Sequence, residues 1–304
     1  MENKYFIIDF DSTFITVEGL DILAEIALVE HPERNQVLDR IKTLTIQGME
    51  GKMSFADSLA ERISLFSANK THIEKTVQRL KKTVTPSFLR NIHFFQEYCH
   101  RIYVISGGFK ELVVPIVQML GLSEKNVFAN TFVFDQKGHI LGIDTNNMMS
   151  RSSGKAAVVR SLDLDGDITI VGDGFTDLEA SRIPSGEFIA FTENVLRKNI
   201  VKDADDSVKT FDELLYAKQL PRALSYPKSL MKVLLLENID KNAVDAFRRE
   251  GYIVHTYTKS MKKDELMRKI KAVHILGIRS RTRIDADILA QAKRLLAIGA
   301  FCIG

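Results

Sequence analysis

Two aspartates, Asp9 and Asp11, stand directly after a short apolar run at residues 5–8. The length and composition of this run predict a buried strand that ends where the two acids begin. In open α/β folds, ligands bind at the edge formed by the carboxyl ends of the parallel strands. The acid pair therefore favours a parallel sheet with Asp9 and Asp11 at its carboxyl edge.

Segments typical of strands and of helices alternate through the first 215 residues, which is the pattern of a parallel sheet covered by helices. Strands are predicted at residues 5–10, 101–106, 126–134, 168–171 and 187–190. Glycine-rich turns at 106–108 and 172–174 directly follow two of them. Backbone N–H groups in such turns can bind an anion. The predicted fold class is α/β, with a Rossmann-like parallel-sheet core.

A long segment separates the first predicted strand from the second. Apolar residues recur there at helical spacing, in residues 22–27 and 55–66, so we expect helices from residue 18 to about 86. The insertion is too long for a simple crossover between parallel strands. It predicts a helical cap that closes over the strand ends and excludes water.

A linker with two prolines is predicted at residues 217–230 and separates a domain of residues 1–216 from one of residues 231–304. Charge supports this boundary, because residues 231–304 hold 15 Lys and Arg against 8 Asp and Glu, whereas the first 230 residues hold 27 against 31. The second part predicts another strand–helix series, a partial flavodoxin-like α/β domain. Its strands are predicted at 232–237, 252–257, 273–278 and 295–301, and its helices at 242–250, 263–270 and 285–294.

The composition, 45% hydrophobic and 27% charged, is ordinary for a globular protein. We expect a cytoplasmic enzyme without a membrane partner, because no apolar run approaches the ~20 residues of a membrane span and the first residues lack a secretory pattern. Cys99 and Cys302 are too far apart to suggest a disulfide framework or zinc cluster. The basic second part lacks interleaved aromatic residues, so nucleic-acid binding is not expected.

The polar residues after the strands suit phosphoryl transfer. Enzymes accelerate phosphate-monoester hydrolysis by up to ~10²¹, and a general base alone supplies only ~10²–10⁴. Such a site therefore needs a nucleophile, charge neutralisation and positioning together. Asp9 is the candidate nucleophile, which would form an aspartyl phosphate, and Asp11 the candidate general acid and then base. Ser106 and the N–H groups of Gly107 and Gly108 are candidates to bind the phosphoryl oxygens.

Charge neutralisation can come from a lysine and a metal ion. Lys155, at a predicted helix start, would neutralise the phosphoryl group and hold Asp9 ionised. Asp173 would complete a Mg²⁺ site with Asp9 and the main-chain carbonyl of Asp11, with Asp177 orienting these groups. Each element alone is more often a turn, a helix cap or a solvated side chain. Their succession after strands favours the catalytic interpretation.

These four segments together resemble the motifs of the haloacid dehalogenase superfamily. They are Asp-Phe-Asp-Ser-Thr at 9–13, Ile-Ser-Gly-Gly at 105–108, Lys155, and Val-Gly-Asp-Gly-Phe-Thr-Asp at 171–177. The cap resembles the phosphoserine phosphatase branch through Glu18, the segment 48–53, Phe55 and Arg62. The resemblance covers about residues 5–210.

This resemblance implies roles for the cap. Glu18 would face the substrate amine, Arg62 would pair with its carboxylate, and Met49 and Phe55 would line a lid. Thr176, where some relatives carry asparagine, would bond phosphate or water. A zwitterionic amino acid needs one anion and one fork-shaped cation, which agrees with these roles. The expected activity is Mg²⁺-dependent hydrolysis of O-phospho-L-serine, a small-molecule substrate, at the last step of serine biosynthesis.

Residues 231–304 resemble the start of the substrate-binding domain of D-3-phosphoglycerate dehydrogenases, at 232–237, 276–282 and 298–304. The resemblance implies that Arg279 and Ser280 contact an acidic substrate. The sequence has no Gly-x-Gly-x-x-Gly dinucleotide turn, so no oxidoreductase activity is expected. These two enzyme families act at the first and last steps of serine synthesis, and their fusion supports phosphoserine as the substrate.

Several alternatives stay open at this point. The first domain can be a phosphatase for another small phosphomonoester, a phosphotransferase, or a non-catalytic protein that binds serine or phosphoglycerate. The second part is interpreted as the truncated end of a bifunctional chain, or as a remnant used for anchoring or for forming a homodimer.

Overall fold

The computed structural model describes residues 4–223 and 228–302. The chain divides into two compact units, Met1–Phe211 and Asp212–Gly304, each described by itself below. Some predicted segments lie partly outside the described residues: residues 1–3 of the chain start, 224–227 of the predicted linker and 303–304 of the terminal apolar segment.

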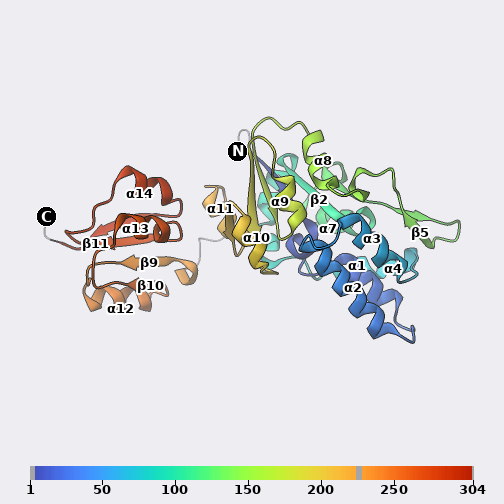
Figure 1. Ribbon diagram of the computed structural model, residues 1–304, viewed down its shortest axis with the longest axis horizontal. Coiled ribbons are helices and arrows are strands. Elements are labelled where there is room, and N and C mark those ends of the chain that lie inside the picture. The colour runs from blue at the N-terminus through green and yellow to red at the C-terminus, as the bar shows by residue number, and fades with distance from the viewer. Residues whose placement is uncertain (1–3, 224–227, 303–304) are drawn as a thin grey trace. The chain divides into compact units, whose positions relative to one another are not determined.

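A six-stranded parallel sheet forms the centre of the first unit (Figure 1). Its strands, in spatial order, are β3 (Val127–Asn130), β2 (Ile102–Phe109), β1 (Lys4–Ile8), β6 (Asp167–Gly172), β7 (Gly186–Phe191) and β8 (Asp206–Val208). Strand β1 pairs with β2 on one side and with β6 on the other. The residues after β1 therefore emerge at the middle of the carboxyl edge, next to the carboxyl ends of β2 and β6.

Helices and an aromatic cluster complete this core. The helices outside the cap are α5 (Pro86–Arg90), α6 (Ile92–Glu97), α7 (Lys110–Val117), α8 (Gly154–Ser161), α9 (Phe175–Ala180) and α10 (Lys198–Asp203). Helix α11 (Phe211–Ala217) begins at the last residue of this unit, and its other residues belong to the second unit. Phe14 lies in the turn η1 (Phe10–Phe14) that carries Asp11, and its ring centroid is 5.1 Å from that of Phe88 and 5.7 Å from that of Phe95. Fully buried rings in contact anchor this turn to the core.

The cap consists of four helices after η1: α1 (Gly19–Ala27), α2 (Arg34–Met49), α3 (Phe55–Ser64) and α4 (Lys70–Leu80). In Figure 1 they gather on one side of the first unit, where α2 packs on α3 and α1 on α4. The Ser54 hydroxyl accepts the Asp57 N–H at the start of α3, and Asn69 forms a capping box at the start of α4. Such caps satisfy N–H groups that a helix leaves unpaired.

The prediction of one strand over residues 126–134 is wrong. The segment divides at Thr131 into β3, which joins the sheet, and β4 (Phe132–Phe134), which pairs antiparallel with β5 (Ile140–Ile143). The Asn147 side chain donates to the Ala129 carbonyl and to the Thr131 hydroxyl at this division. The chain changes sheets although its apolar residues continue, so composition alone could not reveal the break.

The second unit has a four-stranded parallel sheet, in the order β10 (Ile253–Thr256), β9 (Lys232–Leu235), β11 (Ile275–Ile278) and β12 (Ala297–Ala300). Its helices are α12 (Lys241–Arg249), α13 (Lys263–Ile270) and α14 (Ala286–Gln291). The predicted fold class is confirmed: a parallel α/β core with an inserted helical cap precedes a smaller α/β unit. Among the described residues, no helix is long and apolar enough to cross a bilayer.

Candidate active site

Asp9 lies one residue beyond β1, and its backbone N–H continues the ladder by donating to the Val171 carbonyl at 2.9 Å. The buried Asp9 carboxylate accepts a 2.7 Å hydrogen bond from the Lys155 ammonium, which donates a second 2.7 Å bond to Asp177. Lys155 is the second residue of α8, which starts at Gly154. A Cβ at Gly154 would stand 2.5 Å from the Met148 carbonyl oxygen, so only glycine allows this close approach.

The Lys155 ammonium stays charged in this setting. Burial alone would lower its pKa, but the charges and hydrogen bonds of Asp177 and Asp9 outweigh that effect and hold the pKa above its ordinary range. The ammonium therefore places a lasting positive charge 2.7 Å from the Asp9 carboxylate. Lys155 thus connects the end of β1 to α9.

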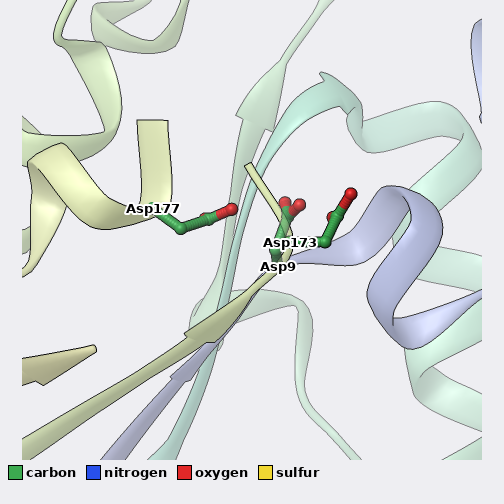
Figure 2. A group of neighbouring side chains, drawn as sticks. All are labelled: Asp9, Asp173 and Asp177. Atoms are coloured by element: carbon green, nitrogen blue, oxygen red, sulfur yellow. The ribbon is translucent and has the colours of Figure 1, made fainter. Parts of the chain in front are cut away.

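Figure 2 shows three neighbouring carboxylates: Asp9 after β1, Asp173 after β6 and Asp177 on α9. Two of them, Asp9 and Asp177, accept hydrogen bonds from Lys155. One oxygen from each lies within 4.8 Å of the others, and all three residues are buried. Burial, and then the charge of Asp9, raise the pKa of Asp173 and of Asp177 to about 7. Buried oxygen donors with excess negative charge fit a hard divalent cation such as Mg²⁺.

Asp173 also bonds to two side chains that sequence reasoning missed. One oxygen accepts the Thr13 hydroxyl at 3.2 Å, and the other accepts the Arg197 Nε–H at 2.8 Å. Arg197 directly precedes α10. Asp173 and Arg197 are 24 residues apart, and no local motif links them.

Asp11 turns its carboxylate towards the cap rather than towards Asp173. Its Oδ1 accepts the Gly19 N–H at 2.6 Å, at the first residue of α1. Burial raises its pKa to about 7, and the charge of Asp9 adds to this although the bond from Gly19 opposes it. Near neutral pH a large fraction of Asp11 therefore carries a proton, which suits a general acid next to the candidate nucleophile Asp9.

The Ser-Gly-Gly segment at residues 106–108 belongs to β2, the strand that pairs with β1, and it lies close to Asp11. The Gly108 N–H donates to the Ser106 hydroxyl oxygen at 2.9 Å. A Cβ at Gly107 would stand 2.5 Å from the Phe55 ring, and one at Gly108 would stand 2.9 Å from Asp11 Oδ2. The two glycines let the cap and the acids approach this backbone closely.

Cap residues complete a small cavity over the strand ends. Its lining includes the predicted residues Asp9, Asp11, Glu18, Met49, Phe55, Arg62, Gly107, Gly108, Lys155 and Thr176. The enclosed space is about 20 Å³, which is about the room for one water molecule. The other predicted residues contact this lining. Ser106 is buried and accepts a hydrogen bond from the Gly108 N–H, and Asp173 and Asp177 belong to the carboxylate cluster that contains Asp9. The structure thus brings together all the residues predicted for the first domain and shows the cap closed, so a ligand needs the cap to open.

The two charged cap residues are held in different ways. Glu18 accepts the Ser12 hydroxyl at 2.6 Å, and burial, with the nearby Asp11, raises its pKa to about 8. Arg62 is buried, donates to the Thr45 hydroxyl at 3.0 Å, and lies 4.0 Å from Asp21 Oδ1. Sequence reasoning missed Thr45 and Asp21. Asp21 could have been found from sequence, because it follows Glu18 by three residues at the start of α1, and residues with this spacing are neighbours on a helix.

The second unit has a polar cavity of its own at the carboxyl ends of its strands. It measures about 290 Å³, and its lining includes Lys259, Arg279, Ser280 and Arg281. The Glu237 carboxylate accepts the N–H groups of Arg281 at 2.9 Å and Thr282 at 2.8 Å, which fixes the loop after β11. The structure thus places Arg279 and Ser280, the pair named from sequence, at a cavity with three basic side chains.

Comparison with known proteins follows the same division. Residues 6–182 match the model of haloacid dehalogenase-like hydrolases, and residues 233–304 match that of the catalytic domain of D-isomer specific 2-hydroxyacid dehydrogenases. A phosphoserine phosphatase of Drosophila melanogaster is 35% identical over 211 residues, which are 68% of this chain and 75% of that protein. The chain belongs to the family of haloacid dehalogenase-like hydrolases.

Two further likenesses bear on the separate units. A solved structure described as a phospho-aspartyl intermediate analogue of phosphoserine phosphatase is 25% identical, with a TM-score of 0.56. The match covers 73% of this chain and 100% of the chain in that structure. A D-3-phosphoglycerate dehydrogenase of Dictyostelium discoideum is 50% identical over 80 residues, 26% of this chain. Those residues span only 20% of that dehydrogenase.

Proposed function

We propose that the first unit hydrolyses O-phospho-L-serine to L-serine and inorganic phosphate. The observation that carries this proposal is the closed cavity whose lining combines Asp9, bonded to Lys155, with two cap residues, the acid Glu18 and the cation Arg62. A phosphate ester with an amine and a carboxylate matches this set of charges. The phosphatase relative and the phospho-aspartyl analogue support the same reaction.

The chemistry divides into two displacements at phosphorus. In the first, an Asp9 oxygen attacks phosphorus, the bond from phosphorus to the serine oxygen breaks, and Asp11 gives its proton to that oxygen. In the second, Asp11 takes a proton from water, the water oxygen attacks phosphorus, and the bond to Asp9 breaks. The pKa of about 7 allows Asp11 to hold and release this proton near neutral pH. Lys155 and the Ser106–Gly108 segment stabilise the phosphoryl oxygens.

The cap residues select the amino acid. The Arg62 guanidinium can bind the substrate carboxylate with two parallel hydrogen bonds. Glu18 has a pKa of about 8, and a substrate ammonium beside it would favour its ionised form. Met49 and Phe55 cover the substrate, and Thr176 can donate a hydrogen bond to phosphate or water. Substrate binding and cap closure are thus coupled.

We expect Arg62→Ala to change substrate preference. Its kcat/KM for O-phospho-L-serine should fall about 10²-fold, because a buried charge pair to the carboxylate is worth about 2–5 kcal/mol. Phosphoethanolamine lacks only the carboxylate, so its kcat/KM should change much less. Steady-state phosphate release with both esters measures this. Arg79→Ala, which removes an exposed cap arginine paired with Glu25, serves as the control. Equal losses for the two esters would contradict the role of Arg62.

Mg²⁺ is the proposed cofactor. Asp9, Asp173 and the main-chain carbonyl of Asp11 would hold it, with Asp177 orienting the cluster through its bond to Lys155. A bound divalent cation supplies charge neutralisation for the phosphoryl oxygens. The buried cluster fits such an ion because it gathers three carboxylates within 4.8 Å of one another, whereas two cations, Lys155 and Arg197, are bonded to them.

Metal binding should be visible without catalysis. In protein first treated with chelator, Mg²⁺ at about 100 times its Kd should stabilise the fold by about 2.7 kcal/mol, seen as a higher Tm. Asp173→Asn should abolish most of this shift, because it removes a charged oxygen donor. Asp167→Asn is the matched control, since Asp167 is exposed at the opposite end of the same strand. An undiminished Tm shift in Asp173→Asn would exclude Asp173 as a ligand.

The second unit supports the choice of substrate. Its relative is a D-3-phosphoglycerate dehydrogenase, and we infer that both units derive from enzymes of serine biosynthesis. We propose no dehydrogenase activity for this chain, because the matched segment is one fifth of that relative.

A further inference from the structure

The ladder between β2 and β3 is irregular next to the Ser-Gly-Gly segment. Ile105 pairs with Phe128, and the next pair along the ladder is Phe109 with Asn130. Three residues of β2 stand between these pairs against one residue of β3. The segment 106–108 therefore leaves the regular ladder. Bulges of this kind re-aim backbone groups beside active sites, and the groups they release need other partners.

The Asn130 side chain replaces the missing ladder bond. Its Nδ2 donates to the Gly107 carbonyl at 2.8 Å, and the residue is fully buried at the end of β3. Its Oδ1 has no hydrogen-bond partner among the described residues. A buried side-chain amide whose NH₂ group is hydrogen-bonded while its oxygen has no partner is uncommon and calls for an explanation. The bond to Gly107 supplies one, because it holds a peptide group of the segment proposed to bind the phosphoryl oxygens.

The bond acts on the next residue through the geometry of the peptide group. A trans peptide is planar, with its C=O and N–H pointing in opposite directions. Holding the Gly107 carbonyl therefore also orients the Gly108 N–H, which donates to the Ser106 hydroxyl oxygen at 2.9 Å. A serine hydroxyl has one hydrogen and two lone pairs. When its oxygen accepts from Gly108, its own hydrogen remains available for a phosphoryl oxygen.

We propose that Asn130 is a positioning residue that fixes the Gly107–Gly108 peptide and so keeps the Ser106 hydroxyl as a donor to the phosphoryl group. This inference rests on the proposed function, since the ligand it serves is the phosphoryl group. Asn130 lies behind the segment and does not line the cavity that the substrate would enter. It therefore acts through Gly107 and touches neither Asp9 nor the substrate pocket.

Asn130→Leu tests the inference, because leucine has a similar size and cannot donate a hydrogen bond. We expect kcat for O-phospho-L-serine to fall by about 10-fold to 100-fold, less than the ~10²–10³ that losing a transition-state donor itself costs. KM should change far less than kcat, because the cap residues that bind the amino acid stay in place. The affinity for inorganic phosphate, measured by calorimetry, should fall as well.

Asn126→Leu is the matched control. Asn126 also uses Nδ2 to hold backbone carbonyls around β2, those of Cys99 at 2.8 Å and Ile102 at 2.9 Å, at the end of the strand remote from the acids. Asn126→Leu should lower Tm while kcat and phosphate affinity stay within a factor of about two. A general packing role for the two asparagines would instead lower Tm in both variants and leave kcat unchanged in both.

The outcomes separate this inference from the proposed function. Wild-type protein without phosphatase activity would contradict the function. The role of Asn130 could then still be tested by NMR of protein labelled with ¹⁵N-glycine. The quantity measured is the change that inorganic phosphate causes in the Gly108 amide signal. An active wild type with Asn130→Leu within about threefold in kcat would overturn the role of Asn130, and so would an equal loss in Asn126→Leu. If Asn130→Leu does not fold, Asn130→Val replaces it, because a β-branched residue suits a strand.

Discussion

Replacing Asp9 with asparagine is expected to lower kcat for O-phospho-L-serine by a factor on the order of 10⁴ or more, as loss of other catalytic nucleophiles does. The neutral amide is a poor nucleophile, and the oxygen that should attack phosphorus loses its charge. The fold should persist, because asparagine has nearly the same shape and its amide oxygen can still accept from Lys155. Removing one of three clustered carboxylates also relieves repulsion among them.

The measurement needs two readouts. Phosphate release at saturating substrate gives kcat, and mass spectrometry of the variant excludes deamidation back to aspartate. Protein quenched during turnover of ³²P-labelled substrate should carry label in the wild type and none in Asp9→Asn. Asp167→Asn, at the exposed start of β6, is the control for a surface aspartate. More than a few per cent of activity in Asp9→Asn would exclude Asp9 as the nucleophile.

Lys155→Met should damage both activity and stability. Lys155 is the shared cation of two buried carboxylates, with 2.7 Å bonds to Asp9 and Asp177. Breaking a buried ion pair by removing one partner typically costs about 3–5 kcal/mol, because it leaves buried charge uncompensated. We expect a loss of that size in the free energy of unfolding at pH 8. Activity should fall by about 10³-fold or more, because the phosphoryl group loses a fixed positive charge.

The stability loss should depend on pH in a defined direction. Burial, and then the charge of Asp9, raise the pKa of Asp177 to about 7 even with Lys155 opposing the shift, and methionine removes that opposition. Above a pH of about 4, the unfolded chain releases the proton of Asp177, while the folded protein retains it to a pH of about 7 or higher. The stabilisation from this carboxyl is therefore fully present below that range and is lost as the pH rises through it.

Urea denaturation of Lys155→Met at several pH values measures this effect. The free energy of unfolding, relative to wild type, should be lowest at pH 8 and should recover as the pH falls towards 5. Lys241→Met is the control, because Lys241 is exposed at the first position of α12. A difference from wild type that stays constant from pH 5 to 8 would contradict the view that Lys155 compensates buried carboxylates.

The four motif positions could be read from sequence because their placement is a local property. Asp9 and Asp173 lie just beyond the carboxyl ends of strands that run parallel, so the fold class alone brings them to one edge. The predicted turn at residues 106–108 is wrong, because β2 continues through Ser106 to Phe109 with an irregular register. Lys155 was identified from its helix start, and the structure shows the contact that matters, a bridge between Asp9 and Asp177. The helical cap was also predictable, since its apolar residues repeat at helical spacing.

Other features depend on contacts between distant segments. Arg197 on Asp173, and Thr45 beside Arg62, join residues that no local pattern connects. The division of residues 126–134 is of the same kind, because an apolar run does not show at which residue a chain leaves one sheet for another. The bond from Asn130 to Gly107 follows from the β2–β3 register, which only the paired strands define.

The sequence by itself determined the parallel α/β core, the inserted cap and the acid pair at the end of the first strand, because strand period, helix period and motif spacing are local. The tertiary structure alone decided the surroundings of each acid. The Asp9 carboxylate accepts a hydrogen bond from the Lys155 ammonium, 146 positions away, whereas Asp11 is buried against Gly19 with its pKa raised to about 7. Burial and neighbouring charge set the pKa of a carboxyl group, and distant segments of the chain supply both.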